Sequence, residues 1–119
     1  NRNFDYQIRF KGANYNTKVW LNGSFLGVHN GGFTPFAFNM NKIIKAKNNF
    51  LVVRIENIRM SYRIPSLFFD WFNWGGIYRD IDLMILNKNR LEDVVIKTTL
   101  TTKKKVLLMF YIISLEIFH

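Results

Sequence analysis

The chain has 119 residues, of which 49% are hydrophobic and 17% aromatic, and it carries a formal net charge of +9. This length allows one domain, or one domain with part of another, and the apolar content excludes a disordered chain. Because cysteine is absent, a disulfide framework and a thiolate metal site are also excluded. The cations are scattered along the chain, which favours solvated surface charge over a nucleic-acid interface.

The N-terminal part of the chain has strand patterns. Residues 4–11 alternate apolar and polar side chains with a period of two, which predicts a strand with one buried face. Residues 18–27 predict a hairpin, because Asn22 and Gly23 tolerate the positive φ angles of a type I′ turn. We therefore expect antiparallel pairing in this region.

The next segment has one more strand and a single helix signal. Residues 33–38 predict a strand with Pro35 near its start or edge. Residues 39–49 permit one short helical turn, with Asn39 or Asn41 as its cap. No other part of the sequence supports a helix.

A long irregular stretch separates two further strand patterns. Residues 51–56 alternate as a strand, and residues 57–76 follow as a loop whose length is typical of a functional segment. The apolar residues at 77, 81, 83 and 85 share one face of the next predicted strand, which we expect to point inward.

The C-terminal part restarts the strand pattern. Apolar residues at 94 and 96 precede the run 106–113, and Lys103–Lys105 lies where a hairpin turn is expected. That run is too short for a transmembrane helix, which needs about 20 residues, so no membrane partner is predicted. It is interpreted as a strand cut off from its sheet. Many short strands, frequent turn signals and almost no helix predict an all-β, antiparallel β-sandwich.

The loop from Asp70 to Asp80 is the most informative stretch. Trp71, Phe72 and Trp74 cannot all be buried within five residues of loop, so some of them must face a cavity or a partner. A carboxylate beside aromatic faces can accept hydrogen bonds from two sugar hydroxyls. Asp70 is therefore the first candidate for carbohydrate binding, and the alternative is an Asx turn that only holds the loop.

Neighbouring residues in this loop have secondary roles. Asn73 and Trp74 are candidate substrate-binding residues, although Trp74 could instead pack against an adjacent domain. Gly75 and Gly76 permit positive φ angles or a close backbone approach, and are predicted to support the site. The other two aromatic residues are interpreted as packing residues.

Two further side chains are predicted to support the site. Arg79 falls on the inward parity of its strand, so its guanidinium needs an ion pair with Asp70 or a loop carbonyl. His29 is a lone histidine at a strand end, for which a structural role is expected. The sequence has no metal-ligand spacing and no phosphate-binding loop, so neither a metal nor a cofactor is predicted.

Several segments resemble one enzyme family when they are taken in order. Residues 70–80 are similar to the D-x-F-N-[YW]-x-G-I-x-R segment that closes the N-terminal sandwich of glycoside hydrolase family 2, which includes β-glucuronidases, β-galactosidases and β-mannosidases. Residues 19–23 (V-W-L-N-G), 29–36 (H-N-G-G-F-T-P-F) and 51–57 also match, so the similarity covers roughly residues 4–97. Asn30 departs from the Glu or Gln that the family often has after His29.

The resemblance implies a domain organisation. Residues 1–89 would form a jelly-roll domain of the galactose-binding type, incomplete at its N-terminus, and residues 90–119 would begin an immunoglobulin-like sandwich. Because the sequence starts without methionine and runs directly into a strand pattern, it is expected to be a segment of a longer protein.

The resemblance also implies a function. In the family, the aspartate that matches Asp70 contacts the terminal β-linked sugar, and both catalytic glutamates lie on a C-terminal barrel of the same polypeptide. Retaining hydrolysis needs two carboxylates about 5 Å apart, and no acidic residue here pairs persuasively with Asp70. We therefore expect a non-catalytic, sugar-binding fragment of an exo-β-glycosidase. The alternatives are a stand-alone carbohydrate-binding module and a purely structural interdomain module.

Overall fold

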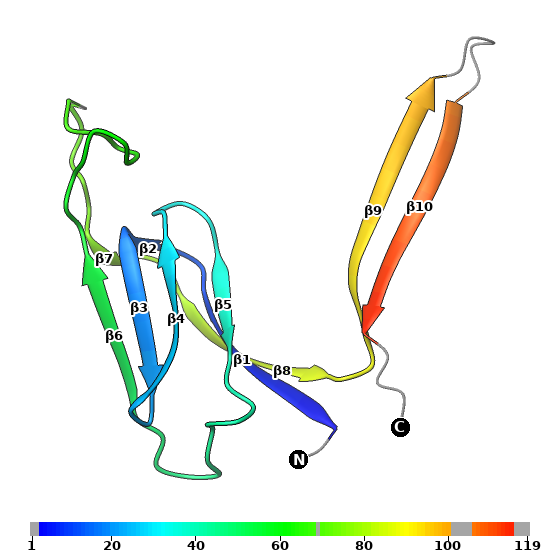
Figure 1. Cartoon of the computed structure of the whole chain (residues 1–119), viewed down its shortest axis with the longest axis horizontal. Helices are drawn as coiled ribbons and strands as arrows, with labels where there is room; N and C mark the ends of the chain where they lie inside the picture. Colours follow the sequence, from blue (N-terminus) through cyan, green and yellow to red (C-terminus); the bar gives the residue numbers. More distant parts are fainter. Residues whose placement is uncertain (1–2, 69, 101–105, 116–119) are drawn as a thin grey trace. The chain divides into compact units, whose positions relative to one another are not determined.

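The computed structural model describes residues 3–68, 70–100 and 106–115, and these residues form strands and no helix (Figure 1). The strands are β1 (Phe4–Phe10), β2 (Ala13–Asn14), β3 (Asn16–Leu21), β4 (Ser24–Asn30), β5 (Phe36–Asn39), β6 (Leu51–Glu56), β7 (Gly76–Ile77), β8 (Ile81–Asn87), β9 (Arg90–Leu100) and β10 (Val106–Leu115). The chain divides into two compact units. The first unit is Asp5–Ile85, and the second combines Asn1–Phe4 with Leu86–His119.

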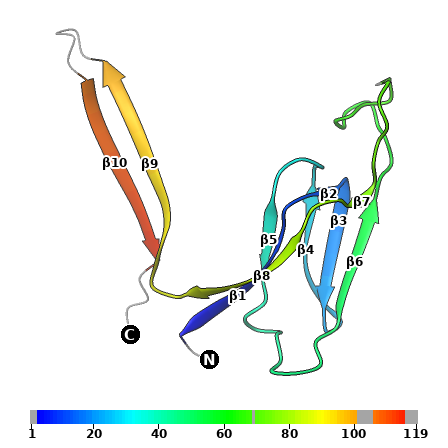
Figure 2. The ribbon, with the colours of Figure 1, turned by 180° about the vertical axis from the view of Figure 1, so that it is seen from behind.

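One sheet of the first unit has the order β4-β3-β6, with β3 between its two antiparallel neighbours (Figure 2). The predicted hairpin is confirmed, because Asn22 and Gly23 connect β3 to β4 with φ angles of 52° and 84°. The Asn22 side chain also accepts a hydrogen bond from the Phe50 amide at 2.9 Å and donates one to the Ile43 carbonyl at 3.0 Å. The turn therefore also fixes the segment that leads into β6.

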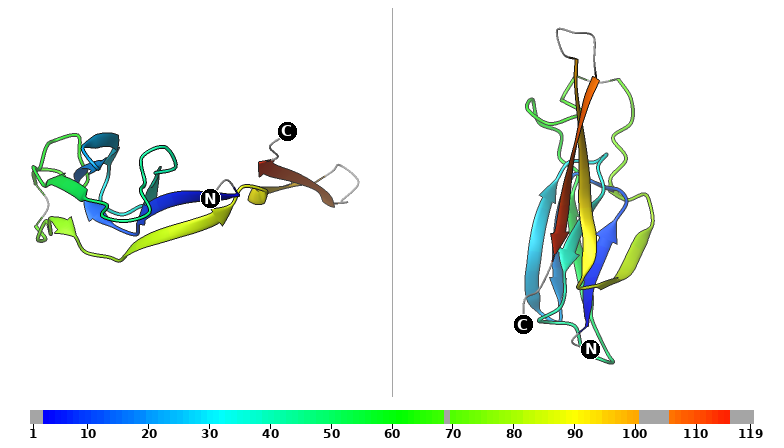
Figure 3. Two further views of the ribbon diagram at one scale, coloured as in Figure 1. Left: turned by 90° about the horizontal axis from the view of Figure 1, so that it is seen from below. Right: turned by 90° about the vertical axis from the view of Figure 1, so that its right-hand side faces the viewer.

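The second sheet has the order β5-β1-β8, and β1 runs beside β8 (Figure 3). The alternation of β1 is confirmed at its end, where Ile8 and Phe10 are 7% and 0% exposed and Arg9 between them is exposed. These two side chains form the core with Val19 and Leu21 of β3 and with Met40. Residues of both sheets thus enclose one apolar core, and the predicted antiparallel all-β sandwich is confirmed.

Residues 39–49 form a hydrogen-bonded turn and not a helix. The Ile44 amide donates to the Met40 carbonyl at 2.9 Å, which is the spacing of one α-helical turn. The Asn39 side chain accepts from the Asn41 amide at 2.8 Å and so caps this turn. The core contact of Met40 holds the segment against the sandwich.

The predicted inward face after the loop is wrong. β7 ends at Ile77, where it pairs with β2, and the chain bends before β8 begins at Ile81. Residues 77 and 81 therefore do not belong to one continuous strand. In β8 the side chains of Ile81, Leu83 and Ile85 share a face, but they are 39%, 60% and 57% exposed. Strand periodicity identified residues with a common face, but it did not show which face is covered.

The second unit contains the hairpin of β9 and β10, which twist about one another (Figure 3). The register runs from Val106 opposite Leu100 to Leu115 opposite Arg90, with a bulge between Ile113 and Ser114. The predicted strand at 106–113 is thus confirmed, and its partner is β9. The expected turn at Lys103–Lys105 lies outside the described residues. Within the described residues no helix is long and apolar enough to cross a membrane.

Candidate functional site

The loop between β6 and β7 is cross-linked by its own side chains. The side-chain Nδ2 group of Asn57 donates to the backbone carbonyl of Asn73 at 2.7 Å. In return, the Nδ2 group of Asn73 donates to the side-chain Oδ1 of Asn57. The Arg59 guanidinium donates to the carbonyl of Trp71. Because these bonds join the two limbs of the loop, residues 70–76 are held in place although they have almost no regular structure.

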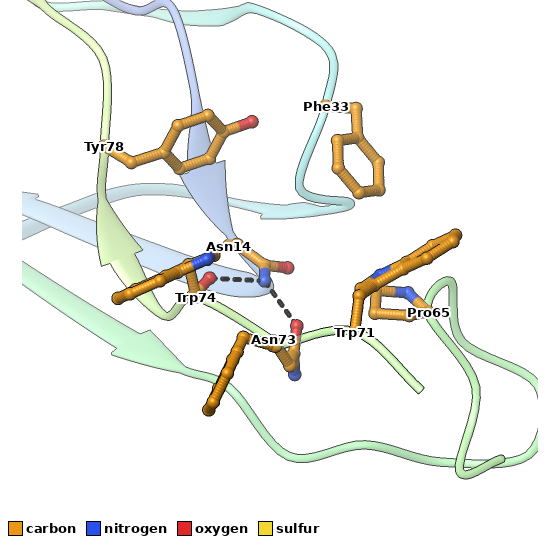
Figure 4. A pocket seen from close by; sticks show the side chains of 8 residues that line it. Asn14, Phe33, Pro65, Trp71, Asn73, Trp74 and Tyr78 are labelled. Atoms are coloured by element: carbon orange, nitrogen blue, oxygen red, sulfur yellow. Dashed lines mark hydrogen bonds between the residues drawn. The ribbon is translucent and has the colours of Figure 1, made fainter. Parts of the chain in front are cut away.

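Asn14 fixes the same loop from β2. Its Nδ2 group donates to Asn73 Oδ1 at 2.8 Å and to the Trp74 carbonyl at 2.7 Å (Figure 4). The residue is 5% exposed, and its Oδ1 atom is buried without a hydrogen-bond partner among the described residues. Asn14 could not be predicted from the sequence, because an asparagine in a two-residue strand has no pattern that marks it.

Gly75 precedes β7 and Gly76 is its first residue, and one shows the predicted close approach and the other the predicted positive φ angle. Gly76 has a φ angle of 92°, in the region that disfavours other residues. At Gly75 a Cβ atom would lie 2.5 Å from Asn57 Nδ2, so a side chain there would displace the amide that holds the loop. Their role in a binding site stays a prediction.

The loop encloses a hollow of about 640 Å³, which we call the aromatic hollow (Figure 4). Its lining residues come from β2, from the β4–β5 connection, from the loop and from the segment after β7: Asn14, Phe33, Pro65, Trp71, Phe72, Asn73, Trp74 and Tyr78. Trp71, Phe72 and Trp74 are 53%, 83% and 75% exposed. The structure places Trp71 and Phe72, which were interpreted as packing residues, in the lining of the hollow, and the Phe72 ring lies 5.8 Å from the Trp74 ring.

Asp70 lies beside the aromatic hollow and does not line it. Its side chain is exposed and forms no hydrogen bond or ion pair with another described residue. The Asx turn considered as its alternative role is thus not formed. Of the predicted substrate-binding residues, the structure places Asn73 and Trp74 in the lining and Asp70 at the residue next to it.

Arg79 does not take the position expected from strand parity. It lies in the bend before β8, is exposed, and places its guanidinium 5.6 Å from the centroid of the Tyr78 ring. No ion pair joins it to Asp70. The Tyr78 hydroxyl donates to the Gly32 carbonyl, so Tyr78 connects the hollow to the turn after β4.

His29 lies at the other side of that turn, at the end of β4. Its ring stacks on Phe36 with the centroids 4.1 Å apart, and Nε2 is 3.5 Å from Thr34 Oγ1. Burial lowers the pKa of His29 below its ordinary value of 6.5. These contacts are those of a residue that supports the 29–36 turn.

This pKa predicts a pH dependence of stability. In the unfolded chain His29 takes up a proton near its ordinary pKa of 6.5. In the folded chain its pKa is lower, so protonation requires a lower pH. Stability is therefore expected to fall as the pH drops below 6.5, and to be regained above it. The measurement is the NMR titration of the His29 ring together with the unfolding midpoint at about pH 5.5 and about pH 7.5. In His29→Gln the difference between the two midpoints should shrink, and an unchanged difference would contradict the assignment.

The acidic residues near the site are engaged elsewhere. Lys11 Nζ lies 3.3 Å from both Asp80 and Asp82, and the hydrogen bond to Asp80 raises the pKa of Lys11. Glu56 pairs with Arg63 at 3.2 Å. Among the described residues no group of three His, Cys, Asp or Glu side chains is placed to hold a metal ion.

The first unit is thus a β-sandwich whose loop presents exposed aromatic rings next to a carboxylate that pairs with no other described residue. Residues 1–87 match the family model "Glycosyl hydrolases family 2, sugar binding domain". The chain belongs to glycoside hydrolase family 2, and this match confirms the family predicted from the motifs.

Relatives with known names agree with this assignment. The chain is 38% identical to a putative β-glucuronidase of Formosa agariphila over 93 residues, which are 78% of this chain and 11% of that protein. It is 40% identical to a β-galactosidase of Thermoanaerobacter pseudethanolicus over 91 residues, 73% of this chain and 12% of the relative. The chain thus spans about an eighth of the length of these relatives.

Solved structures show the same fold. A β-glucuronidase from an uncultured Clostridium species superimposes with a TM-score of 0.80 and 26% identity, over 95% of this chain and 21% of that one. A putative β-galactosidase from Bacteroides fragilis gives a TM-score of 0.77 with 25% identity, over 92% of this chain and 18% of that one.

Proposed function

We propose that this chain is the non-catalytic, sugar-binding part of a retaining exo-β-glycosidase, and that its loop brings Asp70 to the glycone pocket of a catalytic barrel in the same polypeptide. The relatives named β-glucuronidase and β-galactosidase support a glycosidase as the parent protein. Their names differ in the sugar, so the proposal specifies a terminal β-linked sugar and no particular glycone.

The observation that carries this proposal is the Asp70 carboxylate, which pairs with no other residue that the structure describes. Asp70 is exposed next to a loop that Asn14 and Asn57 hold in place. An ionised carboxylate can accept hydrogen bonds from two neighbouring hydroxyls. Because the loop is already ordered by these amides, sugar binding would require little further ordering. Such bonds would orient the sugar for attack and discriminate between epimers.

Catalytic groups would come from outside this chain. Hydrolysis with retention needs an acid/base and a nucleophile about 5 Å apart. Asp80 and Asp82 share Lys11, and Glu56 is paired with Arg63, so these carboxylates serve the sandwich. We therefore expect residues 1–119 alone to be inactive.

The domain boundary belongs to the same proposal. Residues 1–89 would be the sugar-binding sandwich, and residues 90–119 would begin an immunoglobulin-like sandwich to which the β9–β10 hairpin contributes its first strands. The support for this division is that β9 and β10 pair with one another over most of their length.

The test is hydrolysis of a panel of 4-nitrophenyl β-glycosides by the full-length protein. We expect activity on at least one glycoside, with the β-anomer of the sugar appearing first in the proton NMR spectrum. Sugar binding without hydrolysis would favour the stand-alone carbohydrate-binding module. Neither binding nor hydrolysis would favour a structural interdomain module. Either outcome would overturn the proposed function.

A further inference from the structure

The aromatic hollow is chemically different from the place where Asp70 would hold a sugar. Its volume of about 640 Å³ lies within the range of small-molecule pockets, roughly 300–1,000 Å³. Rings from three segments form its walls, with Phe33 and Trp71 on one side and Tyr78 and Trp74 on the other (Figure 4). Flat apolar walls of this kind favour an aromatic ligand, which can stack on them or meet them edge to face.

The amide and hydroxyl groups of the hollow are engaged in the scaffold with one exception, Asn14 Oδ1, which is buried without a partner among the described residues. Asn14 Nδ2 donates both of its protons, to Asn73 Oδ1 and to the Trp74 carbonyl. The Asn73 amide group donates to Asn57, and the Tyr78 hydroxyl donates to Gly32. A sugar ring placed here would lose water from its hydroxyls and find few new partners, which weakens binding. An aromatic ring has no such requirement.

Charge restricts the ligand further. None of the eight described residues of the lining is charged, and the nearby Arg79 stacks on Tyr78 and is not among them. A carboxylate or a phosphate in the hollow would therefore lack a counter-ion. The hollow suits an uncharged aromatic group.

The position of the hollow indicates what this group is attached to. Trp71 lines the hollow, and the preceding residue is Asp70. Adjacent Cα atoms are about 3.8 Å apart, so Asp70 lies immediately next to a lining residue. We propose that the aromatic hollow binds an uncharged aryl aglycone of the β-glycoside whose sugar Asp70 contacts. This inference rests on the proposed function and assigns a substrate class to it.

The test compares two substrates in the full-length protein, using the sugar on which that protein is active. Phe33→Ala removes one wall of the hollow, and Phe33 is 60% exposed, so the sandwich should tolerate the change. We expect kcat/KM for the 2-naphthyl β-glycoside to fall roughly three- to tenfold, as for the loss of one aromatic contact. For the methyl β-glycoside the loss should stay below about twofold.

Two further variants keep the test decisive. Trp74→Ala, in the opposite part of the lining, should reproduce the selective loss. Phe25→Ala is the matched control, because Phe25 is 54% exposed on β4 and does not line the hollow. It should leave both substrates unchanged. The thermal midpoint of each variant shows whether it is folded.

The binding readout is independent of turnover. A 2-naphthyl β-thioglycoside, titrated by tryptophan fluorescence, should bind more weakly to Phe33→Ala and normally to Phe25→Ala. Equal losses for the naphthyl and methyl glycosides would mean that the hollow contacts the sugar, and would overturn the inference while the proposed function stands. Unchanged kinetics in both hollow variants would overturn it as well. Absence of hydrolysis of every glycoside would overturn the proposed function itself.

Discussion

Replacement of Asp70 by asparagine is expected to lower kcat/KM of the full-length protein for its β-glycoside by about 100-fold. Each hydrogen bond to a charged group contributes about 1.5–3 kcal/mol, and 1.36 kcal/mol corresponds to a factor of ten. The substitution keeps the shape of the side chain but removes its charge and one of its acceptor positions. Because Asp70 pairs with no other described residue, its loss should not disturb the fold.

The measurement is steady-state kinetics of Asp70→Asn with the best 4-nitrophenyl β-glycoside. Asp93→Asn is the matched control, since Asp93 is exposed on β9 and its side chain accepts a hydrogen bond from the adjacent Val94 amide. A loss confined to KM would indicate that Asp70 binds the sugar equally in the ground state and in the transition state. Unchanged kinetics in Asp70→Asn would remove this residue from the site.

Replacement of Phe10 by alanine should destabilise the sandwich by about 3–5 kcal/mol, which is comparable to the total stability of many small domains. Phe10 is 0% exposed and stacks on Phe36 with the ring centroids 5.0 Å apart. Its side chain lies between the two sheets, beside Val19 of β3. Truncation would leave a cavity at the centre of the core, where neighbouring strands cannot move to fill it.

Urea denaturation followed by tryptophan fluorescence measures this loss. Phe68→Ala is the control, because Phe68 is 92% exposed and the same truncation there should change the free energy of unfolding by no more than about 0.5 kcal/mol. Similar losses at both positions would contradict the assignment of Phe10 to the core. The full-length protein should be used for both variants, with the first unfolding transition compared.

Elements that depend on local sequence were predicted well. The Asn22-Gly23 pair defines its turn through the two positive φ angles that it tolerates, and the structure has both. Alternation in residues 4–10 predicted β1, because a strand at a sheet surface turns successive side chains to opposite faces. The ordered motifs around Trp20, His29 and Asp70 predicted the family that the comparison with its model confirmed.

Features that depend on distant contacts were not predicted. Asn14 reaches Asn73 across 59 residues of sequence, and neither residue carries a local signal of that contact. The inward position of Arg79 was predicted from the alternation of side chains along one continuous strand. A bend separates β7 from β8, so the alternation does not continue through residue 79. The two aromatic residues after Asp70 were interpreted as packing, since composition does not distinguish a ring in a core from a ring that lines a hollow.

The sequence by itself determined the strands, the hairpin turn, the sandwich class and the family, because these follow from side-chain periodicity, φ preferences and motif order over short distances. Only the tertiary structure decided which face of β8 is covered, how the asparagines hold the loop, and that Asp70 stands beside the aromatic hollow and not in its lining. Those features depend on which segments meet after folding. A pattern within one segment contains no information about the side chains that lie opposite it.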